Sequence, residues 1–410
     1  MHPDASELRA RWVFPVDHPP IENGVVRVAQ GCIAEVRPVD AFAPADARSA
    51  SLALIPGLVN AHTHLEFSDL QTPLTANSTF ADWIRSVIEY RRERTMPIPE
   101  ILAAGLHESA AAGVTTLGEI CTAGWSAEPF QPETPRAVAF REAISLDPSA
   151  ADRVAATISV HVEALRRDSE LIPAVSPHAP YSVHPDLFRK LVAIARGSSV
   201  PLAFHLAETR DELELLAEGT GPLVELFDSS GFWQPDAIPR GARPLDYLRM
   251  LESVSHTLVI HGNYLDAEEI DFLAGKPQFT VVYCPRTHAH FGHDAHPWLE
   301  LCSRGVRVAL GTDSRASNPD LSVWNELLYL RDRFPDVGPF DLLELGTRAG
   351  AAALGLDQRI GTLTPGKSAD VTVLELAGAD LDDPRERLLH PETRPIAAIR
   401  NGNWIATPTQ

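Results

Sequence analysis

The sequence predicts an α/β protein: a (β/α)8 TIM barrel with a small β-sandwich domain built from both termini. Three observations support this fold class. Eight apolar, strand-like runs alternate with helical patterns over roughly 300 residues, as in barrels of this type. Short alternating strand patterns occur near both ends of the chain. Finally, 44% of the 410 residues are hydrophobic, which is ample for a large core.

The eight candidate strands share one design, an apolar run that closes on a polar residue or a turn. They are "LIPGLVNAHTH", "GVTTLGEI", "RAVAFREAI", "IPAVSPHAP", "PLAFHLAE", "TLVIHGN", "FTVVYCPRT" and "VRVALGTDS". Between them, segments such as "PDLFRKLVAIAR" have the spacing of apolar residues expected of helices packed on a barrel. We assign residues 56–365 to this barrel.

The two ends of the chain have a different texture. Residues 1–55 contain "GVVRVAQGCIAEVRP", and residues 366–410 contain "SADVTVLEL" and "IAAIRNGNWI". Short alternating pieces broken by proline and glycine predict short antiparallel strands. We expect the two ends to pair into one composite β-sandwich domain beside the barrel.

Composition excludes several classes of partner. The formal net charge is −20 and there is no basic patch, which argues against nucleic acid and anionic membrane surfaces. No apolar run approaches the roughly 20 residues of a membrane span, and the start has no signal-peptide core. The cysteines form no CxxC pair; they are Cys32, Cys121, Cys284 and Cys302. We expect a cytoplasmic protein that acts on a small molecule, with homo-oligomerisation left open.

Polar residues close most of the candidate strands. In a barrel of this type, catalytic side chains stand at the C-terminal ends of the strands. A single histidine there would be a hydrogen-bonded rim residue, but so many in equivalent positions predict one shared site. The residues are His62, His64, Glu119, His178, His205, Glu208, His261 and Asp313.

The first strand carries an HxH pair. His62 and His64 lie two apart, so both imidazoles leave the same face of the strand and reach one ion. His205 and Asp313 from two other strands complete a shell of nitrogen and oxygen ligands. Such ligands suit Zn²⁺ or another borderline divalent ion. We predict one divalent metal ion, with zinc preferred.

Several motifs resemble a known family. "PGLVNAHTHLEF", "SPHAPYSV", "HLAET", "GTDSRASNPDLSVWNEL" and "TPGKSADVTVLE" are similar to the amidohydrolase superfamily, in its metal-dependent deaminase and chlorohydrolase branch. The resemblance implies a barrel with a terminal β-sandwich. It also implies that His62, His64, His205 and Asp313 hold a single ion, zinc or iron (Zn²⁺ or Fe²⁺).

Lysine usage supports a single ion. Members of the superfamily with two metals usually bridge them with a carboxylated lysine from a middle strand. This chain has three lysines, and none of them ends a candidate strand; they are Lys190, Lys276 and Lys367. We therefore predict a mononuclear site.

The predicted chemistry is hydrolytic. A bound divalent ion lowers the pKa of its water from 15.7 towards about 7. We expect Asp313 to accept a proton from that water and His261 to orient it. Glu208 would deliver protons to the substrate ring and to leaving ammonia, the role that the resemblance gives to the glutamate of an HxxE element. The alternative for Glu208 is a solvated carboxylate at the start of the acidic run "ETRDELELLAE".

Four further residues are candidate substrate contacts: Glu66, Trp83, His178 and His288. His178 matches a histidine that contacts substrate in similar nucleoside deaminases. His288 lies in "CPRTH", where this branch usually carries a pattern like CPxSN. The segment "THAHFGHDAHPW" could instead bind a surface ion, but we expect an irregular loop without the rigid support that a metal site needs.

The segments "HLEFS", "FADWI" and "GARPLDYL" resemble the aminodeoxyfutalosine, S-adenosylhomocysteine and adenosine-type deaminases. That implies a metal-dependent deaminase of an aminopurine nucleoside. An alternative keeps the fold but changes the bond, to another C–N or C–Cl bond in a triazine, guanine, pterin or cyclic amide. A third is a non-catalytic binding protein on a barrel scaffold. Release of ammonia separates these hypotheses.

Overall fold

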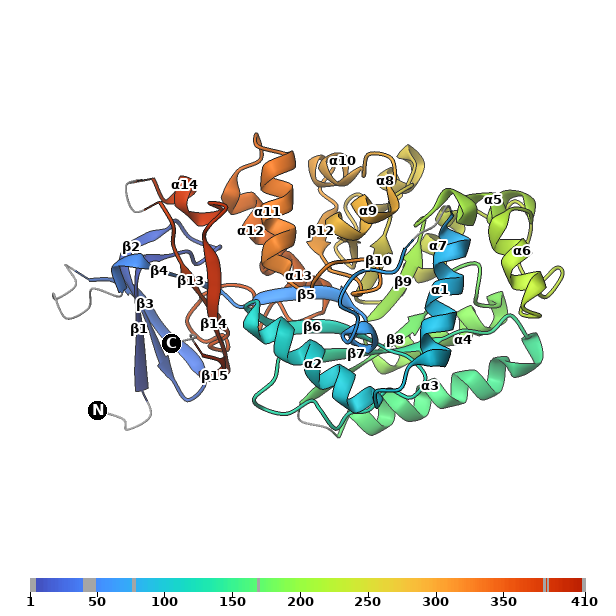
Figure 1. Ribbon diagram of the computed structural model, residues 1–410, viewed down its shortest axis with the longest axis horizontal. Helices are drawn as coiled ribbons and strands as arrows, with labels where there is room; N and C mark the ends of the chain where they lie inside the picture. The colour runs from blue at the N-terminus through green and yellow to red at the C-terminus, as the bar shows by residue number, and fades with distance from the viewer. Residues whose placement is uncertain are drawn as a thin grey trace.

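The computed structural model has two parts that lie side by side, a barrel wrapped by helices and a sheet built from strands near both ends of the chain (Figure 1). No helix among the described residues is both long and apolar enough to span a membrane. Portions of the predicted terminal domain, at 1–4, 40–48 and 408–410, lie outside the described residues. The described residues are 5–39, 49–75, 79–167, 170–378, 381 and 383–407.

The barrel is an eight-stranded parallel sheet whose strands follow one another in chain order. This confirms the predicted fold class. Nearly every strand residue is buried, as expected when helices cover the outside and side chains fill the inside. The strands are β5 (Leu58–Thr63), β6 (Val114–Cys121), β7 (Arg136–Ala143), β8 (Leu171–Pro177), β9 (Leu202–Leu206), β10 (Thr257–His261), β11 (Phe279–Tyr283) and β12 (Arg307–Leu310).

The barrel closes where β12 meets β5. The backbone amides of Thr312 and Asp313 both donate to the carbonyl oxygen of His62 at 3.1 Å. The side-chain amide of Asn60 donates to Thr312 Oγ1 at 2.8 Å and accepts from the Thr312 amide at 3.1 Å. A bridge pairs Thr63 with Asp313. Closure therefore places Asp313 next to the strand that carries the HxH pair.

Helices follow the barrel strands and pack apolar faces on them, except for the last helix, which lies beside the terminal sheet (Figure 1). The helices are α1 (Phe80–Glu93), α2 (Ile98–Ala111), α3 (Ala151–Leu165), α4 (Pro185–Ser198), α5 (Arg210–Glu218), α6 (Pro222–Ser229), α7 (Pro244–Leu251), α8 (Ala267–Leu273), α9 (Pro285–Phe291), α10 (Trp298–Ser303), α11 (Val323–Arg333), α12 (Pro339–Leu345), α13 (Arg348–Ala353) and α14 (Pro384–Leu388).

The histidine-rich segment differs from the expected irregular loop. Its first half forms the helix α9, and only the part after Gly292 is irregular. Pro285 occupies the first turn, where its missing N–H costs nothing. Gly292 ends the helix at φ +65°, a left-handed conformation that glycine adopts without strain. Pro285 and Gly292 thus mark the start and the end of a helix.

The second part is a single mixed sheet of seven strands in the order β15-β14-β13-β4-β1-β2-β3. Both ends of the chain contribute, as predicted, but hydrogen bonding runs through all seven strands and β1 pairs with β4 in parallel. The strands are β1 (Ala5–Val13), β2 (Ile21–Ala29), β3 (Cys32–Pro38), β4 (Leu52–Pro56), β13 (Val371–Glu375), β14 (Arg394–Arg400) and β15 (Asn403–Ala406).

One predicted strand is really two. "LIPGLVNAHTH" divides at Gly57, with β4 in the mixed sheet before it and β5 in the barrel after it. A Cβ atom at Gly57 would lie 2.1 Å from the Oγ1 atom of Thr115, so a side chain does not fit there. The Gly57 amide donates to the carbonyl of Asp370 at 2.9 Å. The chain therefore passes from one sheet to the other within a single, tightly held residue.

A buried ion pair ties the two parts together. Arg136, at the start of β7, donates from Nη1 to Asp370 Oδ2 at 2.6 Å, and both side chains are 2% exposed. The same guanidinium also donates to Thr116 Oγ1 and to Asn401 Oδ1. Because removal of one partner from such a pair leaves a buried charge uncompensated, the pair is sensitive to mutation.

We predict that Arg136→Met lowers the free energy of unfolding by about 3–5 kcal/mol, because Asp370 stays buried without its countercharge. Urea denaturation followed by circular dichroism measures the change. The control is Arg394→Met, whose ion pair with Glu375 is largely exposed, and which should cost under about 1 kcal/mol. Equal effects of the two substitutions would contradict this account.

Candidate active site

A cavity of about 340 Å³ opens at the C-terminal ends of the barrel strands, where the fold predicts the chemistry to lie. Its floor is polar, and its walls come largely from apolar residues of α1 and α6 and the segments beside them. Six of the polar residues predicted from the sequence line this cavity: His64, His178, His205, Glu208, His261 and Asp313. His62 lies beneath this floor and is fully buried.

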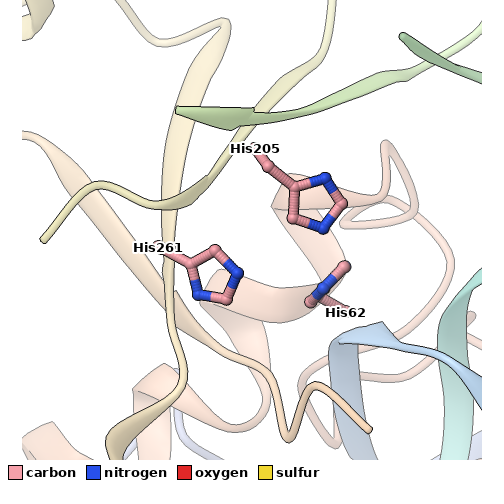
Figure 2. A group of neighbouring side chains, drawn as sticks. All are labelled: His62, His205 and His261. Carbon is pink, nitrogen blue, oxygen red and sulfur yellow. The ribbon is translucent and has the colours of Figure 1, made fainter. Parts of the chain in front are cut away.

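The predicted metal ligands converge. Asp313 Oδ1 lies 3.6 Å from His62 Nε2 and 3.7 Å from His64 Nε2. One ligand atom from each of these three residues lies within 4.8 Å of the others, and the same holds for His62, His205 and His261. Figure 2 shows the latter three imidazoles, carried by β5, β9 and β10, directed toward one another. Since His62 belongs to both groups, the five side chains surround one position.

The residues present fit a divalent cation. Both ring nitrogens of His62 and Nδ1 of His64 are buried without a hydrogen-bond partner among the described residues. Such groups cost roughly 1–3 kcal/mol each unless something binds them. The Nδ1 atom of His205 pairs with the carbonyl oxygen of His178 at 2.9 Å, which leaves Nε2 for an ion. Burial and the neighbouring imidazoles lower the pKa values of His64 and His205, favouring the neutral form that metals bind.

Three residues at the strand ends have positive φ values although none is glycine. They are Ala207 (φ 53°), His261 (φ 67°) and Asp313 (φ 55°), which follow or end β9, β10 and β12. This conformation is uncommon for residues with a side chain, and its strain persists only where the surroundings enforce it. Its recurrence at three strand ends around one cavity is typical of a functional site.

Glu208 lies inside the cavity and is not the solvated carboxylate considered as the alternative. Its residue surface is 6% exposed, and its Oε1 atom lies 3.5 Å from His261 Nε2. Burial raises the pKa of Glu208 well above its ordinary value, and the nearby carboxyl groups of Asp313 and Glu212 raise it further. Such an environment favours the protonated form of a carboxyl group, which is the form that a general acid needs.

Glu212 is a functional residue that the sequence analysis missed. Its two carboxylate oxygens accept the backbone amides of Ala207 and Glu208, each at 2.8 Å. Asn263 completes the arrangement by donating to the Glu208 carbonyl at 2.9 Å. Although it lies in the acidic run, Glu212 is fully buried on the same face of α5 as Leu215 and Leu216. The spacing of three and four residues from Glu212 to Leu215 and Leu216 could have indicated this burial, because residues so spaced share one face of a helix.

A second missed residue supports Asp313. The hydroxyl of Ser317, which is fully buried, donates to Asp313 Oδ2 at 2.7 Å. The hydroxyl of Thr63 donates to the Asp313 carbonyl at 3.0 Å. Because Ser317 engages Oδ2, the other carboxylate oxygen is the one that faces His62 and His64.

The candidate substrate contacts fall into two groups. His178 and Trp83 line the cavity. The imidazole of His178 pairs with Ser182 Oγ at 2.6 Å, and the indole of Trp83 donates to the Ala316 carbonyl at 3.0 Å. Both side chains are thus fixed at the cavity wall. They stay candidates for contact with substrate.

Glu66 and His288 do not line this cavity. Glu66 is buried in ion pairs with two arginines of the α1 region. The ring centroid of His288 lies 5.4 Å from that of His293 and 5.7 Å from that of His296, and Nε2 of His296 pairs with the carbonyl oxygen of His261 at 2.8 Å. The two groups of possible ligand atoms described above both lie at the barrel mouth. Within the described part of the chain, neither group includes a residue of the histidine-rich segment.

The three lysines are all engaged elsewhere. Lys190 pairs with Asp152, Lys276 pairs with Glu252, and Lys367 donates to the carbonyls of Asp357 and Ile360. None of them lines the cavity. The single metal centre stays a prediction.

A closed parallel barrel with histidine and carboxylate ligands at its mouth defines a metal-dependent hydrolase of the (β/α)8 class. Residues 53–408 match the model of the amidohydrolase family, and the chain belongs to that family. It is therefore an amidohydrolase-family enzyme.

Similar proteins span most of the chain. A 5-methylthioadenosine/S-adenosylhomocysteine deaminase from Nitratidesulfovibrio vulgaris is 29% identical over 402 residues, 91% of this chain and 84% of that protein. An aminodeoxyfutalosine deaminase from Deinococcus radiodurans is 30% identical over 332 residues, 75% of this chain and 74% of that protein. The crystal structure of a Xanthomonas campestris adenosine deaminase with bound zinc superimposes with a TM-score of 0.78 at 24% identity, covering 98% of this chain and 93% of that one, and supports the fold.

We predict that Glu212→Gln destabilises the protein by about 1–3 kcal/mol, because a carboxamide can accept only one of the two amides and leaves the other buried without a partner. Thermal and urea unfolding measure this change. Glu218→Gln, an exposed position on the same helix, should leave stability unchanged. Equal stability of both variants would show that Glu212 does not hold the turn.

Proposed function

We propose that this enzyme is a metal-dependent deaminase of an aminopurine nucleoside, of the 5-methylthioadenosine, S-adenosylhomocysteine or aminodeoxyfutalosine type. The observation that carries the proposal is the placement of the buried Glu208 carboxyl group beside a cluster of candidate metal-ligating side chains in one cavity. The names of the two relatives, both deaminases of such nucleosides, support it.

The ion would be held by His62, His64, His205 and Asp313, with His261 beside it. Zinc is preferred because nitrogen and oxygen ligands of this kind suit it, and the similar adenosine deaminase structure holds zinc; Fe²⁺ is the alternative. When bound, such an ion supplies Lewis-acid activation of a water molecule at neutral pH.

The protein's own side chains then move the protons. Asp313 accepts one proton of the attacking water, and the hydrogen bond from Ser317 to Oδ2 holds its carboxylate in place. Glu208 gives its proton to a ring nitrogen of the substrate, and His261 orients the water through its ring nitrogen. Water adds to the amino-bearing carbon, and the bond from that carbon to the amino nitrogen breaks. Glu208 then carries the hydroxyl proton of the adduct to the leaving amino group, which departs as ammonia. The proton held by Asp313 passes to Glu208, so both carboxyl groups return to their starting state.

The walls of the cavity suit a flat, largely apolar ring. Phe80 and Trp83 stack on each other at the end of α1, with ring centroids 5.6 Å apart. Phe227 of α6 lines the same cavity. An enclosure of aromatic side chains with a few polar groups at its floor is the usual form of a small-molecule site.

The test is a screen for ammonia release by the zinc-loaded protein. The compounds are 5′-methylthioadenosine, S-adenosylhomocysteine, adenosine and aminodeoxyfutalosine, with guanosine, cytidine and a pterin for comparison. We expect ammonia only from 6-aminopurine nucleosides, and none after removal of metal with a chelator until zinc is restored. Ammonia from none of the adenine compounds would contradict the proposal.

We predict that Glu208→Gln lowers kcat by roughly 10²- to 10⁴-fold, the usual range for loss of general acid–base catalysis. Metal content, measured by atomic emission, should stay unchanged because Glu208 is not a predicted ligand. Glu218→Gln serves as the matched control, since this exposed carboxylate lies at the C-terminal end of α5 and does not line the cavity. Full activity in the Glu208 variant would show that another group carries the proton.

A further inference from the structure

The last histidine of the histidine-rich segment, His296, contacts the backbone of the active site. Its Nε2 atom pairs with the carbonyl oxygen of His261 at 2.8 Å. Because a carbonyl group only accepts hydrogen bonds, Nε2 carries the proton and donates it. The ladder between β10 and β11 ends at Ile260 and Val282, so His296 satisfies a carbonyl that lies beyond the end of the strand pairing.

The peptide group that links His261 to Gly262 is held at both of its polar atoms. Its amide, on Gly262, donates to the carbonyl of Leu206 at the end of β9, at 3.1 Å. The peptide is trans, so its carbonyl points the opposite way, toward His296. The orientation of this peptide plane is therefore set by the neighbouring strand on one side and by His296 on the other.

The orientation of this peptide also fixes the direction of the His261 side chain. His261 has a φ of 67°, a strained conformation that persists only where the surroundings enforce it. In this conformation the imidazole is directed toward those of His62 and His205 (Figure 2), and its Nε2 atom lies 3.5 Å from Glu208 Oε1. Rotation of the peptide would relieve the strain and would move the imidazole away from Glu208.

His296 is itself fixed in place. Its ring stacks on that of Tyr283, with centroids 3.9 Å apart and an angle of 22° between the planes. The next residue is Pro297, which restricts the backbone of the residue before it. Earlier in the same segment, Nδ1 of His293 pairs with the hydroxyl of Tyr264 at 3.2 Å. A donor supported in this way can hold its acceptor in one position.

We propose that His296 is a positioning residue of the active site, whose Nε2–H group holds the carbonyl of His261 and so keeps the His261 imidazole directed at the attacking water. The proposal rests on the proposed function, because orienting the water is the part that His261 has in that reaction. His296 is not a predicted metal ligand and does not line the catalytic cavity. Its loss should therefore lower kcat and leave the binding of metal and substrate unchanged.

The first experiment compares two substitutions of His296 in the zinc-loaded enzyme. His296→Phe keeps a ring that can stack on Tyr283 but has no donor, whereas His296→Gln carries an amide donor at the position of Nε2. We expect His296→Phe to lower kcat roughly 10- to 100-fold, as displacement of a catalytic group does, with KM and metal content unchanged. His296→Gln should keep most of the activity. Full kcat in His296→Phe, or equal losses in both variants, would overturn the proposal.

His290→Phe is the matched control. His290 lies in the same segment and pairs with the carbonyl of Leu74 at 3.1 Å, and neither residue lines the catalytic cavity. Its kcat should stay unchanged, and a loss as large as that of His296→Phe would count against the proposal. If His296→Phe fails to fold, His296→Asn takes its place, because the asparagine amide reaches the position of Nδ1 and not that of Nε2. Full kcat in His296→Asn would also overturn the proposal.

The second experiment needs neither turnover nor a variant. Nuclear magnetic resonance of ¹⁵N-labelled enzyme shows which ring nitrogen of His296 carries the proton, and the ring is identified by its proximity to that of Tyr283. We expect the proton on Nε2. A proton on Nδ1 alone would overturn the proposal, because the carbonyl of His261 would then lack this donor. Absence of ammonia from every adenine nucleoside would instead overturn the proposed function.

Discussion

The site depends on the closure of the barrel between its last and first strands. The carbonyl of His62 accepts the amides of Thr312 and Asp313, so the strand with two imidazoles and the strand with the carboxylate are locked in one register. Side chains 250 residues apart thereby share one position. A slip of one residue in this pairing would turn Asp313 away from His62 and His64, because successive side chains leave a strand on opposite faces.

Behind the site, buried polar groups maintain a backbone that would not adopt its conformation unaided. Ala207 is followed by Glu208 on a turn whose amides end on Glu212. The HxH strand is continued by a turn in which the Leu65 amide donates to Glu119 at 3.1 Å. These hydrogen bonds hold the strand ends in their strained conformation. In that conformation the reactive side chains point toward one position.

The sequence predicted the features that follow from a repeated pattern of strands. Eight strand patterns and their polar ends predicted the barrel and the convergence of His62, His64, His205 and Asp313, because strand ends in such a barrel meet at one rim. It could not reach features that need contacts between distant elements. Burial of Glu212 depends on how α5 turns toward the core, and the pairing of Glu66 with arginines depends on where α1 lies over the barrel. The division at Gly57 was hidden because both halves of the run are equally apolar.

That division at Gly57 has a mechanical consequence. The small sheet is rigidly connected to the strand that bears the HxH pair. Only Gly57 separates β4 from β5, and the ion pair of Arg136 with Asp370 crosses the same boundary. This connection provides no hinge about which the small sheet and the barrel could rotate, as the lobes of two-lobed enzymes do.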